Sequence, residues 1–563
     1  MISVINQASM DSASSQPSSS HITAISWHQA IGIIYTHIIT IYSHTTPLRT
    51  RVLWSVFIAV FVWLGYVIHR SMARVVMRYL DGAVGYFRPP RVNDADLKIL
   101  DQSLMEIGKS FKETPKRIEA LPKTGWKYEV IMKRLEKLSK CEMDKKQEGK
   151  FTGKNYDLSS DITSIAKEGA HTLLFSNLLH YGLHPGAIQM QNEVQTMCIN
   201  MLNGRNRCTG VSTFGQLESS GLTLLAYKRY FMNEGIITDP EVVLPDTIHP
   251  SWLKACELVK VRAIILKTDS LTGEYKASSL IRLVTSKTIV VVCSAPDSYF
   301  GAMDPVEDIG RLAQARGVNL HVDASMGSFL LPFVEQAGFP ALKTAFDFSV
   351  PGVSSMTAEP STYGGSPAGM SVIMFAHEKY QKALYWSTST WCGYVYASNT
   401  FMGSKGGFII GAAWAALMKI GEKGFTENTK LVVEATQTFI DRLTGTGKFS
   451  VPGSPRLGLV AFRPVDSAIG ICQLGSALEV AGWSLEPVFR TGCLQLTVHK
   501  NNALKLKELV QLLKKASEDL KAGKVQTLAG RWLALDLMER SWKKNRSLGE
   551  EVAREFTHKL YCQ

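Results

Sequence analysis

The sequence has no Cys-x-x-Cys pair and no zinc-finger spacing. Its nine cysteines are scattered along 563 residues, which argues against a disulfide framework or a metal site and is typical of reduced thiols in a cytosolic domain. No basic stripe is interleaved with aromatic residues, so we do not expect nucleic acid as a partner. The net charge of +13 is also compatible with an anionic membrane surface or a phosphorylated substrate.

The chain is too long for a single small core, because domains typically have about 100–200 residues. Its 45% hydrophobic and 20% charged residues are ordinary for a globular protein. The first 20 residues are Ser-rich, which is typical of a disordered terminus. We expect five segments: a polar or interfacial N-terminal segment (1–48), a transmembrane anchor (49–70), a helical connector (71–154), a large domain (155–384) and a smaller C-terminal domain (385–563).

Residues 53–68, LWSVFIAVFVWLGYVI, are the best candidate for a membrane-spanning helix. They carry no charge over a length slightly short of the roughly 20 residues that cross a bilayer. Trp54 and Trp63 suit the membrane interfaces, and a buried core helix is the alternative interpretation. An earlier apolar stretch, 24–42, is interrupted by polar side chains, so it is either an interfacial helix or a second, poor membrane segment.

Basic residues are distributed unevenly around this segment. No Lys or Arg precedes Arg49, whereas Arg70, Arg74 and Arg78 follow the apolar stretch closely. The positive-inside rule therefore predicts that the large domain lies in the cytosol. We do not expect a cleaved signal peptide, because no charged region precedes the apolar stretch.

From about residue 155 the sequence alternates between apolar β-branched runs and amphipathic helices. This pattern predicts an α/β fold with a mostly parallel sheet. A helix rich in small residues, expected over 408–425, begins a C-terminal part with shorter strands, which is typical of a smaller α+β domain. The strands expected in the large domain are 261–267, 288–295, 319–325 and 370–376, and those of the C-terminal part lie in KFSVPG, LGLVAFRP and CLQLTVHK.

Asp323 ends the apolar stretch NLHVDAS, where a carboxylate is unfavourable unless it is paired. In pyridoxal enzymes an aspartate at such a place pairs with the protonated pyridine nitrogen and keeps the ring an electron sink. An aspartate at the end of a strand is more often a helix cap. The position alone leaves both interpretations open.

Longer motifs around Asp323 resemble the sphingosine-1-phosphate lyase family. The most extensive is KTIVVVCSAPDSYFGAMDPVEDIGRLAQARGVNLHVDASMGSFLLPFVEQAGF. LPDTIHPSWLKA is similar to the family segment whose His stacks on the cofactor ring, and it has His249 there. SNLLHYGLHPGAIQMQNEV resembles the family's Asn-Pro-Leu-His segment and retains Asn177 and His180. The likeness covers residues from about 100 to about 500.

A further stretch, STWCGYVYASNTFMGSKGG, resembles one that reaches the phosphate site across a dimer interface in this family. Ser404 is retained there, and Lys405 stands where the family has an Arg. The resemblance implies the type I fold of pyridoxal-phosphate enzymes, with pyridoxal 5'-phosphate as cofactor and a phosphorylated sphingoid base as substrate. It also implies a homodimer, or a heterodimer with an active relative, anchored by a single span in the endoplasmic reticulum membrane.

The phosphate-binding motif departs from the family. The family pattern is Thr-Ser-Gly-Gly-Thr-Glu-Ser, and this chain has TFGQLES. Gly215 is retained, but Gln216 replaces the second glycine and Leu217 replaces a hydroxyl that would donate to the phosphate. Adjacent glycines let backbone N–H groups approach a phosphate at a helix start. We therefore expect weaker phosphate binding, unless Gln216 contributes its own amide.

The loop SMTAEPSTYGGSPAG contains no lysine. The family pattern there is Ser-Ala-Asp-Thr-His-Lys-Tyr-Gly-Tyr-Ala-Pro-Lys-Gly. Aligned on Tyr363 and Gly364, Ser361 stands for the family His, Thr362 for the lysine that forms the Schiff base, and Ala368 for the later lysine. A threonine hydroxyl forms no Schiff base, so cofactor binding is expected to be weak or lost.

Two functions are compatible with these residues. The first is a sphingosine-1-phosphate-lyase-like protein of sphingolipid metabolism that is catalytically impaired because Thr362 replaces the lysine. The second is an active lyase that splits phosphorylated sphingoid bases into a fatty aldehyde and phosphoethanolamine with an unconventional amine. Lys405 is the first candidate for such an amine.

Overall fold

The computed structural model describes residues 92–109, 118–153, 159–205, 208–342, 344–524, 528 and 530–562. Two units are distinguished, Met1–Pro89 and Pro90–Gln563, and every described residue lies in the second. The expected anchor at 53–68 and the apolar stretch at 24–42 lie outside the described residues. Within the described ranges, no helix has both the length and the apolar character needed to cross a bilayer.

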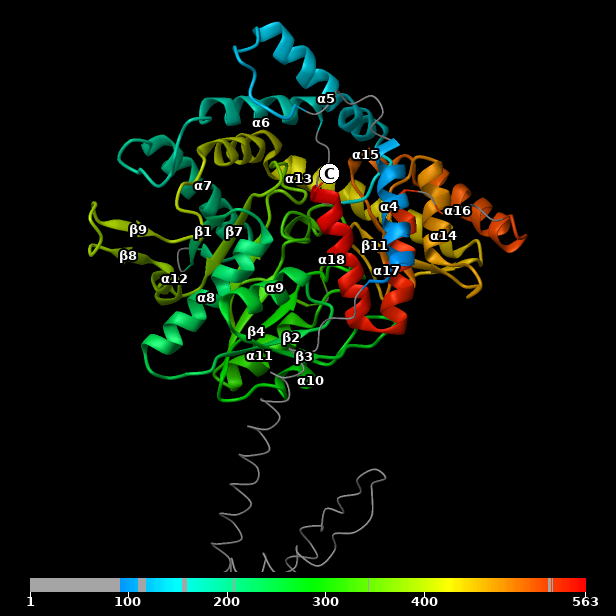
Figure 1. The fold of residues 1–563 in the computed structure, drawn as a ribbon. Helices are drawn as coiled ribbons and strands as arrows, with labels where there is room; N and C mark the ends of the chain where they lie inside the picture. Colours follow the sequence, from blue (N-terminus) through cyan, green and yellow to red (C-terminus); the bar gives the residue numbers. More distant parts are fainter. Residues whose placement is uncertain are drawn as a thin grey trace, which may run out of the picture. The chain divides into compact units, whose positions relative to one another are not determined.

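A seven-stranded sheet forms the centre of the fold, with strand order β1-β7-β6-β5-β4-β2-β3 (Figure 1). β7 runs antiparallel to both its neighbours, and the other neighbouring pairs are parallel. The expectation of a mostly parallel sheet is therefore confirmed. The strands are β1 (Thr209–Thr213), β2 (Glu241–Pro245), β3 (Arg262–Leu266), β4 (Thr288–Ser294), β5 (Asn319–Asp323), β6 (Val353–Ala358) and β7 (Ser371–Phe375).

Helices cover both faces of this sheet, so its central strands are buried on both sides, and β4 and β7 read as nearly continuous apolar runs. Successive residues of a strand point to opposite faces: Val291 packs with one set of helices and Val292 with the other. The first set is α7 (Pro185–Met201), α10 (Ala277–Ile281), α11 (Val306–Ala315) and part of α13 (Gly407–Thr444). The second set is α8 (Gln216–Asn233), α9 (Pro250–Val259) and α12 (Glu378–Leu384).

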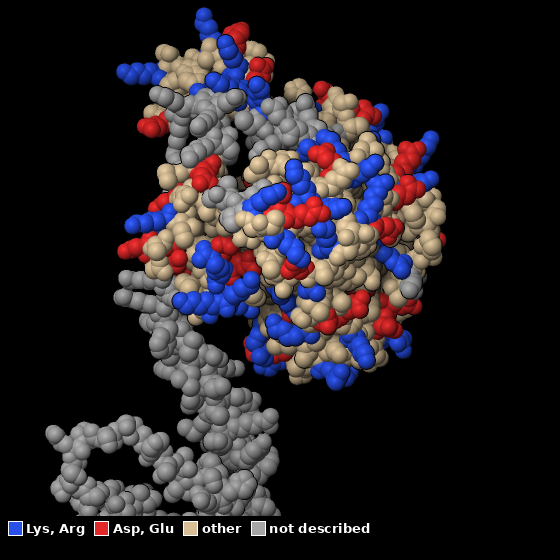
Figure 2. Space-filling view, turned by 90° about the vertical axis from the view of Figure 1, so that its right-hand side faces the viewer, with Lys and Arg blue, Asp and Glu red and all other residues tan. Residues whose placement is uncertain are grey.

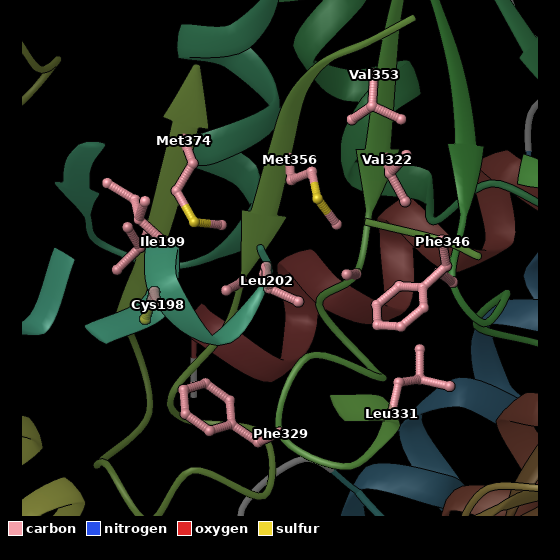
Figure 3. Close-up of a cluster of buried hydrophobic side chains, with 14 of the residues drawn as sticks. Cys198, Ile199, Leu202, Val322, Phe329, Leu331, Phe346, Val353, Met356 and Met374 are labelled. Carbon is pink, nitrogen blue, oxygen red and sulfur yellow. The ribbon is translucent and has the colours of Figure 1, made fainter. Parts of the chain in front are cut away.

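Figure 3 shows the core on the first face. Val322 and Met356 come from neighbouring strands, and Leu202 follows the end of α7 against them. These three side chains are at most marginally exposed. A close-packed layer of this kind fixes the relative positions of the strand ends, which carry the candidate site.

The C-terminal part has a four-stranded antiparallel sheet of order β10-β11-β13-β12. Trp483 and Trp532 are fully buried in its core. Figure 2 shows basic and acidic side chains interspersed over the face on this side. The elements are β10 (Phe449–Ser450), β11 (Leu459–Pro464), β12 (Glu486–Val488), β13 (Cys493–Thr497), α14 (Ile471–Val480), α15 (Lys500–Ala503), α16 (Leu506–Lys521), α17 (Arg531–Lys544) and α18 (Arg546–Cys562).

The expected connector contains helices, as its charge pattern indicates, and they pack on later parts of the chain. α4 (Asp94–Lys109) buries Leu100 against α17 and α18, and the Ser103 hydroxyl donates to the Gly530 carbonyl at 2.7 Å. α6 (Ser160–Thr172) lies against α13, where Gly169 and Gly411 allow close backbone approach. α5 (Tyr128–Glu148) and the short η2 (Leu331–Phe333) complete the described helices.

The strands expected from apolar runs are confirmed as β3, β4, β5, β7, β10, β11 and β13. α13 begins where a helix of small residues was expected, and it is interrupted at Gly421, whose φ of +58° lies in the left-handed region. A two-stranded hairpin, β8 (Trp386–Thr388) and β9 (Tyr396–Ser398), was not expected; it projects from the body at the left of Figure 1. The domain boundaries at 154 and 384 stay predictions.

Candidate active site

The carboxyl end of the central sheet brings the predicted site segments together. β1, β2, β5 and β6 all run in the same direction, so the segments that follow them leave from one edge. Ligands of open α/β folds bind at this edge. Gly215 follows β1, His249 follows β2, Asp323 ends β5, and Ser361 and Thr362 lie in the loop after β6.

Asp323 is a buried carboxylate with four donors from the chain. The backbone N–H and the hydroxyl of Ser325 donate to Oδ1 at 3.1 and 2.5 Å. The Gln216 amide and the Trp252 indole donate to Oδ2 at 2.7 and 2.8 Å. Because these bonds favour the ionised form, they offset the unfavourable burial of the charge.

The electrostatics keep Asp323 ionised and its neighbour neutral. Burial raises the pKa of Asp323, but the hydrogen bonds from Ser325 and Trp252 outweigh it, so the pKa lies below its usual value. Burial lowers the pKa of His321 to about 4. The His321 ring nitrogens lie 2.8 Å from the Ser355 hydroxyl and 3.1 Å from that of Thr357. Asp323 thus provides a negative charge at the strand end.

The start of α8 forms the second part of the site. Gly215 precedes the helix with a φ of +87°, and a Cβ there would lie 3.7 Å from Gly369 of the loop after β6. Behind it, hydroxyls form a chain: Thr213 Oγ1 lies 2.6 Å from Ser219 Oγ, which lies 2.9 Å from Ser371 Oγ. A glycine at a helix start, with hydroxyl groups close by, is a suitable arrangement for binding a phosphate.

The loop after β6 carries the substituted positions. Ser361 Oγ donates to Glu359 Oε1 at 3.0 Å, so the side chain at the position of the family His is paired within its own loop. Thr362 is fully buried, and its hydroxyl has no hydrogen-bond partner among the residues that the structure describes. A buried hydroxyl without a partner is unfavourable by about 1–3 kcal/mol. The described residues therefore supply no hydrogen-bond acceptor or donor for the side chain at this position.

His249 lies at the start of α9. Its Nδ1 accepts from the backbone N–H of Ser251 at 3.2 Å and lies 2.9 Å from the Ser251 hydroxyl, so the side chain caps the helix. The indole of Trp252, the residue after Ser251, donates to Asp323. The structure therefore places His249 on the segment that contacts the buried carboxylate, as a cap whose ring is half-buried.

Asn177, Ser404 and Lys405 form a separate cluster beside β1. Asn177 Nδ2 donates to Ser404 Oγ at 3.2 Å, and its Oδ1 accepts from the Lys405 backbone N–H at 3.1 Å. The Lys405 amine donates to Gln191 Oε1 at 2.9 Å and to the Ser212 carbonyl of β1. Burial lowers the pKa of Lys405 to about 8, although Glu218 opposes the shift. His180 is exposed nearby.

Lys405 and Gln191 line a cavity of about 430 Å³ together with Leu178, Tyr385 and Thr400. The Lys405 amine is not close to Asp323. Neighbouring strands lie about 4.8 Å apart, and β7 and β6 separate β1 from β5, so the Ser212 carbonyl lies roughly 14 Å from β5. The family resemblance assigns Lys405 to the phosphate side of the site, and the sheet order separates it from the side that would hold the ring nitrogen.

Glu218 connects the two parts of the site and was missed from the sequence. Its carboxylate accepts from the backbone N–H of Phe214 at 2.6 Å and from those of Phe401 and Met402 at 3.0 and 3.3 Å. Trp252 and Ser325, the other partners of Asp323, were also missed. Ser325 lies two residues after Asp323, which is the spacing of an Asx turn and could have indicated it.

Comparisons with known proteins identify the family of the chain. Residues 113–465 match the family model described as the pyridoxal-dependent decarboxylase conserved domain. The chain is 31% identical over 411 residues to sphingosine-1-phosphate lyase of Dictyostelium discoideum, covering 73% of this chain and 76% of that protein. It is 32% identical over 416 residues to sphingosine-1-phosphate lyase 1 of Mus musculus, with 73% and 72% covered.

A solved structure gives the same result in three dimensions. The sphingosine-1-phosphate lyase of Burkholderia pseudomallei K96243 superposes with a TM-score of 0.69 and 25% identity, covering 74% of this chain and 96% of that one. These matches make pyridoxal 5'-phosphate the implied cofactor. The chain belongs to the sphingosine-1-phosphate lyase family, within the pyridoxal-dependent decarboxylases.

Proposed function

We propose that the chain is a sphingosine-1-phosphate-lyase-like protein of sphingolipid metabolism whose catalysis is impaired. The observation that carries this proposal is Thr362. It is fully buried at the sheet edge that holds Asp323, its hydroxyl has no partner among the described residues, and it stands at the position of the family's Schiff-base lysine. Asp323 and Gly215 are retained around it, so the fold is compatible with loss of the reactive amine.

The residues present fit part of the cofactor. When bound, pyridoxal phosphate supplies an electron-withdrawing ring that stabilises negative charge on the substrate carbon beside the amine. Asp323 would hold the ring nitrogen, and Gly215 with the hydroxyls of Thr213 and Ser219 would hold the phosphate. The covalent anchor does not fit, because a hydroxyl at Thr362 cannot take the place of an amine.

Losing that amine removes two roles in the family reaction, covalent attachment of the cofactor and proton transfer beside it. Removal of a catalytic nucleophile in other enzymes lowers turnover by several orders of magnitude. Ser361 cannot substitute, because its hydroxyl is held by Glu359 at 3.0 Å. We therefore expect cofactor binding to be weak, non-covalent and easily removed by dialysis.

The substrate class and the assembly follow from the family. A phosphorylated sphingoid base is the ligand we propose, and the cytosolic face of the endoplasmic reticulum membrane, reached by a single span at 53–68, is the proposed location. A second copy of the chain, or an active relative, is the proposed partner. Support comes from family membership and from the charge asymmetry around the apolar segment.

The alternative is an active lyase that uses another amine. Lys405 favours it in one respect, because burial lowers the pKa of its amine to about 8 and so makes the neutral form accessible. Its placement beside Ser212 of β1, roughly three strand spacings from β5, does not bring it to a ring paired with Asp323.

Borohydride reduction in the presence of pyridoxal phosphate distinguishes these functions. The unmodified chain should give no reduced pyridoxyl-lysine at an internal site, whereas Thr362→Lys should give one at position 362, located by mass spectrometry. Thr362→Met is the matched control, because methionine has a volume similar to that of lysine and no amine. Thr362→Lys should recover little turnover, since Ser361 and Ala368 still lack the family's side chains. A pyridoxyl-lysine trapped at Lys405 in the unmodified chain would overturn the proposal.

A further inference from the structure

Gln216 donates to an oxygen of Asp323, the carboxylate that would pair with the ring nitrogen of the cofactor. A carboxylate offers about four acceptor positions. The folded chain directs four donors to them: Ser325 twice, Trp252 once and Gln216 once. A ring N–H can pair with this carboxylate only after one of these donors has moved.

Three of the four donors are fixed by their surroundings. Ser325 donates from two residues along the chain, so its bonds are part of the local turn. Trp252 is 1% exposed, and its ring lies 4.9 Å from that of His321. The indole therefore cannot leave without repacking the core.

Gln216 differs from them because its side chain is unbranched and it is the first residue of α8, directly after Gly215. Its amide contacts Asp323 at 2.7 Å from a different element, across 107 residues of sequence. A neutral amide makes a weaker bond to a carboxylate than a protonated ring nitrogen does, so the ring can displace the amide but loses affinity in doing so.

We propose that Gln216 is a built-in competitor for the ring nitrogen of the cofactor, and that cofactor binding requires its amide to leave Asp323. The amide thus sets how strongly the site prefers a ligand with a protonated ring nitrogen. This inference rests on the family's cofactor and holds whether or not catalysis is impaired.

Calorimetric titration of the full chain in detergent tests it with two probes. One is pyridoxine 5'-phosphate, and the other is its analogue with a CH group in place of the ring nitrogen. Neither has an aldehyde, so neither reacts with lysines, and the result is independent of the borohydride experiment. Gln216→Ala should bind pyridoxine phosphate roughly tenfold or more tightly than the unmodified chain, because the hydrogen bond from the side-chain amide to the charged Asp323 no longer has to be broken. Binding of the CH analogue should change by less than about threefold.

Gln437→Ala is the matched control, because Gln437 Nε2 also donates to a carboxylate, Asp441 Oδ1 at 2.8 Å, on an exposed part of α13. It should leave both affinities unchanged. Unchanged or weaker binding of pyridoxine phosphate in Gln216→Ala would overturn the proposal, and so would an equal gain for both probes, which would indicate space rather than competition.

The unmodified chain provides a second test that does not depend on the variant folding. With Gln216 in place, pyridoxine phosphate and the CH analogue should bind within about threefold of each other. The hydrogen bond that the ring nitrogen gains to Asp323 is offset by the hydrogen bond that the Gln216 amide loses. A preference of more than about tenfold for pyridoxine phosphate would show that Asp323 is freely available, and the proposal would be wrong.

Discussion

Lys405 is a buried cation whose partners are neutral. Its amine donates to the Gln191 amide oxygen and to the Ser212 carbonyl, and Glu218 is the charged group that favours its protonated form. Neutral acceptors compensate a buried ammonium only in part, because the charged form loses more hydration than they replace. Burial consequently dominates and lowers the pKa to about 8 from the usual 10.5.

A dependence of stability on pH follows from this shift. Between pH 8 and pH 10.5 the unfolded chain keeps the proton that the folded chain has lost, so the free energy of unfolding rises with pH in this window. Below about pH 8 both states are protonated, and the unfavourable burial of the charge is fully present. At about 1.4 kcal/mol per pKa unit, the gain across the window is up to about 3.5 kcal/mol.

Urea unfolding of the full chain at pH 7.5 and pH 10 measures this gain against Lys405→Met, which removes the titrating group and keeps the apolar stem. The unmodified chain should gain stability relative to the variant as the pH rises. Parallel pH profiles for the two proteins would mean that the amine stays protonated in the folded state.

At the scale of elements, the β8–β9 hairpin presents apolar side chains to solvent. Tyr394 is 62% exposed and Val395 is 68% exposed, and Trp386 and Trp391 are about half exposed. The stretch resembles the one that crosses to a second subunit in this family. Aromatic side chains are enriched at protein interfaces, because they bury a large area with few rotatable bonds.

We therefore expect the full chain in detergent to sediment as a dimer at micromolar concentration. Val395→Asp should shift it towards monomer, because an unpaired carboxylate would be buried in the contact. Leu504→Asp is the matched control, since Leu504 is 91% exposed and lies between α15 and α16. A monomeric unmodified chain would contradict the assembly, and equal dissociation by both variants would argue against the hairpin as its site.

Elements differ in how well the sequence predicts them. β4 is predictable because its apolar β-branched residues fill both faces of the sheet. β6 (VSSMTA) has hydroxyls where a buried strand usually has apolar groups, so its sequence does not indicate a strand. The hydroxyls are paired by distant residues: Ser354 and Ser355 each lie within 2.9 Å of the Tyr227 hydroxyl.

The same distinction applies to the site. Asp323 is predictable, because its position at a strand end and the motif around it are local. The bond from Gln216 to Asp323 is not, because 107 residues separate the partners and only the sheet order brings them together. The sequence indicates Gln216 as a departure from a glycine pair, and the structure adds what its amide contacts.

For the whole molecule, orientation in the membrane stays a prediction from charge. The arginines after 53–68 should keep Pro90–Gln563 on the cytosolic side. Protease added to sealed microsomes should then degrade this unit, while a lumenal marker survives until detergent is added. Survival of the large unit in sealed vesicles would indicate the opposite orientation, with this unit in the lumen.

The packing of α4 on α17 and α18 sets an order of events during synthesis. Leu100 has its partners Leu537 and Val552 at the far end of the chain, and the backbone N–H of Gly530 donates to Glu106 at 2.6 Å. At about 5–20 residues per second, the ribosome needs roughly 20–90 s to reach those partners. Until then, one of the first helices after the expected anchor has no surface to bury its leucines on. The described unit can therefore close only after α17 and α18 have been synthesised, and a chain that stops before α17 leaves α4 exposed to chaperones and proteases.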